Sequence, residues 1–138
     1  MALKILYETT VKNEYADDGI TTSSQGKSLL IKPTLSQEVG HNPGELLAFS
    51  WATCLEATLR YVCHIKNLKP KTYTTVTYMM QTDEGPPKGY QFIYEAVLHM
   101  NIEDETVRQA LLEETHLRCP ISKLLKSSNI RLMTQEIK

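Results

Sequence analysis

The chain has 138 residues, 41% of them hydrophobic and 22% charged, and fifteen basic residues against sixteen acidic ones give a net charge of −1. This size and balance fit a single globular domain over residues 1–138, and the lack of a basic stripe or tail argues against nucleic acid as a partner. The start at Met1 lacks a basic segment followed by an apolar run, and the longest apolar stretch, residues 46–55, is too short for a bilayer, so we expect a soluble, cytoplasmic protein with no membrane partner.

The first third of the chain reads as an antiparallel meander. Residues 3–11 are rich in β-forming side chains, and residues 20–24 and 27–32 predict two further strands. The segments Asp17-Asp18-Gly19 and Gln25-Gly26 have the composition of turns. We therefore expect three strands that follow one another in a sheet.

A long helix is predicted next. Asn42 is a favourable N-cap, Pro43 occupies the favoured first position, and Glu45 stands three residues after the cap, as in a capping box. From residue 46 to residue 65 the segment is apolar on most sides, which is typical of a helix buried in the middle of a fold. Asn67 marks the end of this long buried central helix.

Two strand-like runs, residues 72–81 and 90–101, follow and are joined by a hairpin loop over residues 83–89. One face of the second run carries alternating apolar residues, namely Tyr90, Phe92, Tyr94, Ala96, Leu98 and Met100. This period of two predicts a strand with one face toward the core.

The last quarter predicts a second helix, capped by Asp104 and ending near Cys119, then a short helical turn to Leu125 and a final strand over residues 129–134. The fold class is therefore α+β. We expect antiparallel sheets segregated from a central helix, rather than alternating strands and helices.

The three cysteines are Cys54, Cys63 and Cys119, an odd count for a disulfide framework. In a reducing cytoplasm a disulfide is usually catalytic or transient. Cys54 lies about three turns into the long helix, where it would either pack as a small hydrophobe or need a nearby cation or hydrogen-bond donor to react. Cys119 precedes Pro120 at a predicted helix start, so it is either a cap in a turn or a thiol whose thiolate the helix stabilises.

Cys63 and His64 are neighbours near the end of the long helix. Adjacent helical residues point in different directions, so we interpret Cys63 as a packing residue. A zinc site formed by His41, Cys63, His64 and His116 would lack the usual ligand spacing. The spacing therefore gives only weak support to a metal site.

Two motifs of the chain resemble those of a known protein family. The run His41 to Ala48 followed by Ala52-Thr53-Cys54 resembles the Asn-Pro-Glu-x-Leu and Ala-Cys helix of the OsmC/Ohr family. The run Arg118 to Ser122 followed by Asn129-Ile130 resembles its Cys-Pro-x-Ser and Asn-Ile segment. Residues 6–10 and the stretch from Asp18 to Lys27 also look like the Ohr branch.

The resemblance implies an intertwined homodimer with two sites at the subunit interface and a long central helix, and it implies no metal and no bound cofactor. It implies an antioxidant, stress-response thiol peroxidase in which Cys54 attacks an organic hydroperoxide and becomes a sulfenic acid. Cys119 then condenses with Cys54 to a disulfide, which a dithiol opens; in the Ohr branch this is a dihydrolipoyl group. Such a pair protects the first sulfur from over-oxidation.

The chain departs from the family at the groups that activate the thiol. Asp17 stands where the Ohr branch has an arginine, and Lys32 is the nearest cation to the place of the OsmC-branch arginine. Gly44 stands where the family has its glutamate, with Glu45 one residue later, a turn of ~100° on a helix. Glu45 is thus either a catalytic residue or the closing residue of the capping box. Without the usual activators, we expect a higher pKa and slower reaction for Cys54.

Two alternatives remain open from the sequence. One keeps the fold but is a catalytically weak or inactive binding or regulatory protein for a hydrophobic molecule. The other is an acyl-thioester hydrolase, in which antiparallel strands also wrap a central helix. An apolar substrate pocket would draw its walls from aromatic and methionine side chains, namely Phe49, Trp51, Tyr61 and Met79 or Met80.

Overall fold

The structure is a computed structural model that describes residues 4–138 except 15, 18, 84, 86–87 and 127–129. Parts of four predictions lie outside the described residues: Leu3 in the first strand, Asp18 in a turn, Glu84, Pro86 and Pro87 in the hairpin loop, and Asn129 at the start of the predicted last strand. Contacts divide the chain into two compact units, Met1–Leu46 and Leu47–Lys138. A single domain over residues 1–138 stays a prediction.

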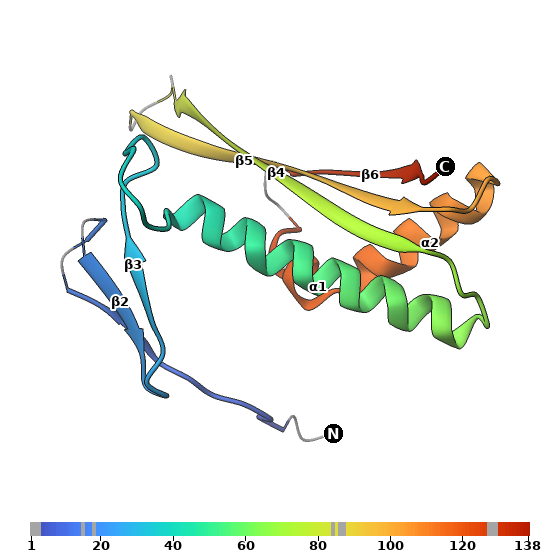
Figure 1. Cartoon of the computed structure of the whole chain (residues 1–138), viewed down its shortest axis with the longest axis horizontal. Helices are drawn as coiled ribbons and strands as arrows, with labels where there is room; N and C mark the ends of the chain where they lie inside the picture. Colours follow the sequence, from blue (N-terminus) through green and yellow to red (C-terminus); the bar gives the residue numbers. More distant parts are fainter. Residues whose placement is uncertain (1–3, 15, 18, 84, 86–87, 127–129) are drawn as a thin grey trace. The chain divides into compact units, whose positions relative to one another are not determined.

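The first unit contains an antiparallel sheet with the order β1-β2-β3, which confirms the predicted meander. The strands are β1 (Val11–Asn13), β2 (Gly19–Ser23) and β3 (Ser28–Ile31) (Figure 1). The prediction of a strand over residues 3–11 is wrong for residues 4–10, which are in no strand of the described chain. β-Forming residues need a neighbouring strand, and β2 pairs with this segment only from Val11 onward.

Helix α1 (Pro43–Ile65) begins and ends as its sequence predicts. At its start, the side-chain oxygen of Asn42 accepts a hydrogen bond of 2.8 Å from the backbone N–H of Glu45. At its end, Asn67 has a φ of 58°, and the N–H of Leu68 donates to the carbonyl of Cys63 at 2.9 Å. The C-terminal geometry is the Schellman motif. In this motif the helix ends at a residue with left-handed backbone conformation, and backbone N–H groups beyond the helix bond its last carbonyls.

The second unit contains a three-stranded sheet with the order β4-β5-β6. Strands β4 (Thr72–Asp83) and β5 (Gly89–Met100) form the predicted antiparallel hairpin. The expectation of purely antiparallel sheets is wrong for β6 (Ile130–Glu136), which pairs in parallel with β5. The chain between them runs through helices α2 (Glu105–Arg118) and α3 (Pro120–Leu124), and such a helical crossover returns the chain in the same direction.

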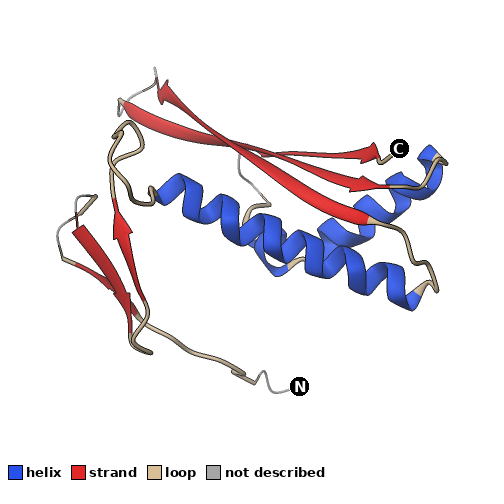
Figure 2. Cartoon of the chain, in the orientation of Figure 1, coloured by secondary structure: helices blue, strands red, loops and turns tan. Residues whose placement is uncertain are grey.

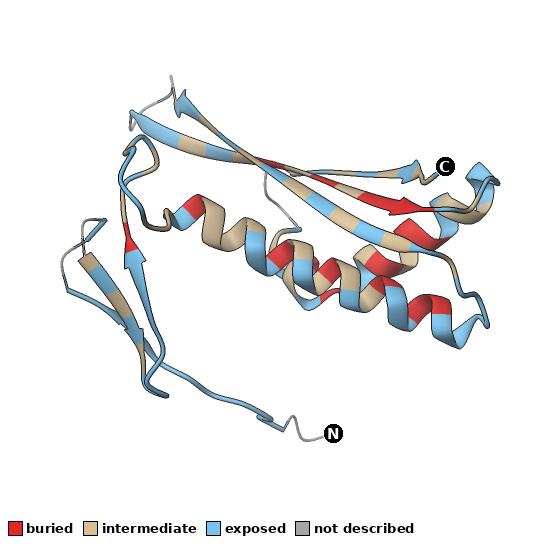
Figure 3. Ribbon diagram, viewed as in Figure 1, coloured by how far each residue is buried: buried red, intermediate tan, exposed pale blue. Residues whose placement is uncertain are grey.

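Within this unit the helices lie on one face of the sheet, as Figures 1 and 2 show. The buried side of the unit is shown in red in Figure 3, and its core includes Trp51, Leu55, Leu59, Val62, Ala96, Leu98, Met100 and Leu111. The predicted alternation on β5 holds from Tyr94 to Met100, whereas Tyr90 and Phe92, at the opposite end of the strand, are exposed.

Helix α1 buries only part of its surface in the single chain. Phe49 is 56% exposed and Tyr61 is 53% exposed, while Leu55 and Leu59 are fully buried. The predicted burial on all sides would therefore need a second surface against the exposed face. In the described part of the chain, no helix has the length and apolar character needed to cross a membrane.

Candidate active site

Cys54 lies on the face of α1 that packs against the core. Trp51 and Leu55, three residues before and one residue after it, are fully buried, and Cys54 itself is half-buried. The hydroxyl of Thr58, one turn later, donates to the backbone carbonyl of Cys54 at 2.8 Å. The helix thus holds the Cys54 thiol at the edge of the hydrophobic core.

Cys119 is the residue at which α2 ends and α3 begins. Its backbone N–H donates to the carbonyl of Thr115 at 2.9 Å, and its sulfur accepts from the backbone N–H of Ser122 at 3.5 Å. Pro120 takes the first position of α3, where its missing N–H costs nothing. The Cys119 side chain is fully buried, so it is both a cap and a core residue.

The fold brings these two thiols into contact. The Sγ of Cys119 donates to the Sγ of Cys54 at 3.0 Å, although the residues are 65 positions apart in the sequence. Both cysteines are free thiols in this structure. The two sulfurs therefore form one dithiol site made by α1 and the junction of α2 with α3.

A second link between the same segments lies beside the thiols. The indole N–H of Trp51 donates to the hydroxyl of Ser122 at 2.9 Å, and both side chains are fully buried. Trp51 is three residues before Cys54, and Ser122 is three residues after Cys119. The sequence pattern did not indicate this bond, and Trp51 was expected among the walls of an apolar pocket. The signal in the sequence was the polar end of a buried tryptophan, which needs a partner.

The pKa of the Cys54 thiol is raised from its ordinary value, chiefly by burial and then by its hydrogen bond with Cys119. A hydrogen bond from the backbone of Ile121 and one from the side chain of Thr58 lower it by less. Among the described residues, no cation contributes to this balance. Arg118, although next to Cys119, pairs with Glu114 at 3.7 Å and lies over the ring of Tyr61.

Glu45 lies in the first turn of α1 and belongs to the first unit. Its carboxylate oxygen Oε1 is 3.1 Å from the Nδ1 of His41, and its backbone N–H is bonded to Asn42. Asn42 thus caps the helix through the backbone N–H of Glu45, whereas the Glu45 carboxylate pairs with His41; closure of a capping box by Glu45 and a catalytic role for it both stay predictions. Lys32, the cation nearest in the sequence to the place of the OsmC-branch arginine, pairs with Glu38 at 3.0 Å.

The remaining site candidates are placed as follows. Cys63 is only 3% exposed and packs in the core, in agreement with its interpretation as a packing residue. Within the part of the chain that is described, no three His, Cys, Asp or Glu side chains are grouped so that they could hold a metal ion. Of the expected pocket walls, Met79 is exposed and Met80 is half-buried.

Comparison with known proteins agrees with this fold. A family model described as OsmC-like protein matches residues 36–134. The chain belongs to the OsmC-like protein family. This match includes both cysteines of the dithiol site and the whole of α1, α2 and α3.

Individual OsmC-like relatives match nearly the whole chain. An organic hydroperoxide resistance protein-like protein of Mycoplasma genitalium is 24% identical over 96% of this chain and 96% of its own. A structure named for a redox protein from Lactobacillus casei is 29% identical, covers 98% of this chain and 93% of that one, and has a TM-score of 0.81. The OhrB structure of Bacillus subtilis is 22% identical, covers 96% and 100%, and has a TM-score of 0.82.

These likenesses confirm the α+β OsmC/Ohr fold that the two motifs indicated. Family membership also points to a redox function related to peroxides. The individual roles of Cys54, Cys119 and Glu45 are not tested by any of these likenesses.

Proposed function

We propose that this OsmC-like protein is a thiol peroxidase that reduces organic hydroperoxides. Cys54 is the peroxidatic cysteine, Cys119 the resolving cysteine, and a dithiol such as a dihydrolipoyl group the reductant. The reaction belongs in a reducing cytoplasm, because the disulfide has to be opened after each turnover.

The cycle balances without a metal or a bound cofactor. The Cys54 thiolate attacks one peroxide oxygen; an S–O bond forms, the O–O bond breaks, and the alkoxide takes a proton and leaves as an alcohol. Cys119 then attacks the sulfenic sulfur of Cys54, which forms an S–S bond and releases water. Two exchanges with the dithiol restore both thiols and leave the reductant as a disulfide.

The observation that supports this proposal is the 3.0 Å between the two sulfurs. A disulfide needs an S–S distance of about 2.05 Å, so the pair has to close by only about 1 Å. The hydrogen bonds that hold Cys119 and the bond between Trp51 and Ser122 fix the segments that carry both thiols. Such a pair can condense without unfolding of either segment.

A turnover assay tests the proposal directly. The purified protein should consume cumene hydroperoxide in the presence of dihydrolipoamide, and Cys54→Ser should abolish turnover. Cys63→Ala removes a buried thiol that lies outside the pair and should keep turnover. Full activity of Cys54→Ser would show that another group is the nucleophile.

We also propose that the working form is a homodimer that covers the exposed face of α1. Phe49 and Tyr61, both more than half exposed in the single chain, lie on this face together with the small side chains of Thr53 and Ala57. Exposed aromatic residues beside small ones favour close packing of a second apolar surface. Analytical ultracentrifugation should give twice the mass of the chain, and Phe49→Asp should shift it toward the monomer. A wild-type monomer at all concentrations would contradict the dimer.

A specific observation also favours the second candidate function, a catalytically weak or inactive binding or regulatory protein. Burial raises the pKa of Cys54, and no described cation offsets that effect. A thiol that stays protonated at neutral pH is a slow nucleophile. Peroxide treatment that leaves both thiols intact, with a hydrophobic ligand bound at the same site, would favour this candidate over the peroxidase.

A further inference from the structure

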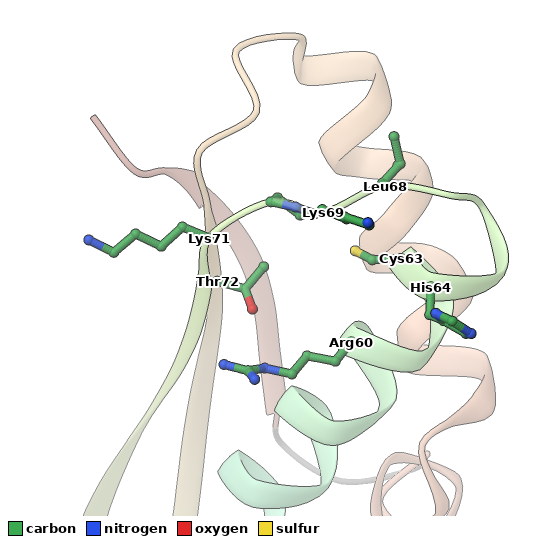
Figure 4. A pocket seen from close by; sticks show the side chains of 8 residues that line it. Arg60, Cys63, His64, Leu68, Lys69, Lys71 and Thr72 are labelled. Atoms are coloured by element: carbon green, nitrogen blue, oxygen red, sulfur yellow. The ribbon is translucent and has the colours of Figure 1, made fainter.

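The end of α1 and the start of β4 enclose a hollow of about 280 Å³, a size suited to a small ligand. Figure 4 shows this hollow between α1, which contributes Arg60, Cys63 and His64, and the following segment, which contributes Lys69 and Lys71. Neither Cys54 nor Cys119 is among the residues that line it. The hollow is therefore a separate feature from the dithiol site.

The side chains that line this hollow carry positive charge, although Glu56 and Glu114 lie nearby. Residues 57–82 contain Arg60, Lys66, Lys69 and Lys71 and no Asp or Glu, in a chain whose net charge is −1. A helix C-terminus carries only about half a negative charge, so capping α1 does not require four cations. The concentration of positive charge is thus larger than the local structure needs.

Part of this positive charge is neutralised and part is not. Arg60 donates through Nε to Glu56 at 2.9 Å, and Lys66 lies 3.9 Å from Glu114. In the described chain, the ammonium groups of Lys69 and Lys71 have no ion-pair partner, and the two terminal nitrogens of Arg60 have no hydrogen-bond partner. In Figure 4 the side chain of Lys71 points away from the other lining residues, so Lys71 adds positive charge at the rim without reaching into the hollow.

Backbone carbonyls at the end of α1 already accept hydrogen bonds from the backbone. The Schellman motif occupies the carbonyl of Cys63 with the N–H of Leu68, at 2.9 Å, and that of His64 with the N–H of Asn67, at 3.1 Å. Helix-end carbonyls that would repel an anion are therefore already bonded. Burial raises the pKa of the Cys63 thiol, and the negative charge of Glu56 raises it further. The thiol of Cys63 therefore stays neutral.

We propose that this hollow binds a small anion through a phosphate group. A guanidinium can hold two phosphate oxygens at once, and lysines add point charges from other directions, which suits a tetrahedral dianion better than a flat carboxylate. The inference rests on Arg60, Lys69 and Lys71 alone and does not depend on the proposed peroxidase activity.

Isothermal titration calorimetry on the full chain tests this site, with inorganic phosphate and glycerol 3-phosphate as probes and sodium chloride at matched ionic strength as the blank. We expect saturable binding of at least one probe that weakens as salt rises, because exposed charges are screened. Tighter binding of the ester would identify a phosphorylated metabolite as the ligand, and equal or tighter binding of phosphate would identify the free ion. Absence of saturable heat with both probes would overturn the proposal.

A pair of charge-matched variants locates the binding. Lys69→Gln with Lys71→Gln should weaken binding roughly fivefold or more, since each exposed ion pair contributes a modest amount. Lys27→Gln with Lys126→Gln removes the same charge from other exposed positions and should change binding by less than about twofold. Equal weakening by both pairs would show a non-specific charge effect and overturn the site. Cys54→Ser should bind the probe as the wild type does.

Discussion

At the scale of single residues, the two cysteines differ in what surrounds them. Cys119 is fully buried and held by backbone hydrogen bonds on both sides. Cys54 is half-buried and faces both the core and the neighbouring thiol. Its thiolate has to be formed against burial, with only hydrogen bonds from Ile121 and Thr58 in its favour. The reactivity of the site is therefore set by the surroundings of Cys54.

The first prediction concerns the titration of Cys54. In a Cys63→Ala background, the rate of alkylation of Cys54 should rise with pH and have its midpoint above neutral, because burial and Cys119 both raise the pKa. Cys119→Ala removes one of these causes and should move the midpoint to lower pH. Stopped-flow alkylation followed by mass spectrometry measures both. A midpoint well below neutral in the parent would contradict the argument.

At the scale of elements, α1 is attached to its surroundings by two polar contacts at different points. One is the bond between Trp51 and Ser122, which connects α1 to α3 beside the thiols. The other is the carboxylate of Glu56, which accepts from the hydroxyls of Thr72 at 2.6 Å and Thr74 at 3.0 Å and so connects α1 to β4. These contacts fix the position of the helix relative to both of its neighbours.

The second prediction concerns the contact beside the thiols. Ser122→Ala leaves the buried indole N–H of Trp51 without a partner, which should lower the free energy of unfolding by about 1–3 kcal/mol. It should also slow formation of the disulfide between the thiols, because α3 is held less firmly. Thr106→Ala, at an exposed position of α2, is the control and should stay within about 0.5 kcal/mol of the parent. Urea unfolding and stopped-flow oxidation give the two readouts, and an unchanged oxidation rate would refute the positioning role.

The third prediction concerns the contact with β4. Glu56→Gln replaces one of the two acceptor oxygens by an N–H₂ group, which faces the hydroxyl donor of Thr72 or of Thr74, so the free energy of unfolding should fall by about 1–3 kcal/mol. Glu113→Gln changes the same charge on an exposed surface and should cost less than about 0.5 kcal/mol. Equal unfolding midpoints for the two variants in urea would show that the buried carboxylate contributes nothing.

At the scale of the whole molecule, the buried titratable groups restrict stability to the middle of the pH range. Burial lowers the pKa of His99 and His116 below the ordinary value of 6.5, so their contribution is present above that pH and is lost as the pH falls through the lowered values. Burial raises the pKa of Cys54 and Cys63, and that of Tyr94 to about 12. Their contribution is present below their ordinary values and is lost as the pH rises through the raised ones.

The fourth prediction follows from these opposite signs. The melting temperature should be highest between pH 6.5 and the alkaline range where unfolded cysteines ionise, and should fall on both sides. His99→Gln should reduce the loss of melting temperature between pH 7 and pH 5, whereas the exposed His64→Gln should not. Differential scanning calorimetry at fixed protein concentration gives the curve. A melting temperature that keeps rising to pH 10 would contradict it.

The sequence predicted the parts of this fold that depend on local signals. The caps at Asn42 and Asp104 rest on side chains that bond nearby backbone N–H groups, the end at Asn67 rests on a left-handed backbone conformation, and all three are confirmed. The parallel pairing of β6 could not be foreseen in this way. It depends on how α2 and α3 return the chain to the sheet, which is a tertiary property.

The same distinction applies to the candidate site. The position of Cys54 in a helix gave no reason to choose a reactive thiol over a packing residue. Only the resemblance of the two motifs connected Cys54 with Cys119. The contact between their sulfurs and the bond between Trp51 and Ser122 arise where α1 meets α3, so they appear only in the folded chain. Why the family's activating arginine is replaced by Asp17 has no explanation in this structure.

One measurement tests the central claim most directly, and it is the fifth prediction. The reduced protein is treated with one equivalent of cumene hydroperoxide, and its peptides are mapped by mass spectrometry without reduction. We predict a single disulfide between Cys54 and Cys119 with Cys63 unmodified, and sulfinic or sulfonic acid on Cys54 when Cys119→Ser is treated with an excess of the peroxide. Both thiols left reduced after the peroxide is consumed, or a disulfide that includes Cys63, would contradict it.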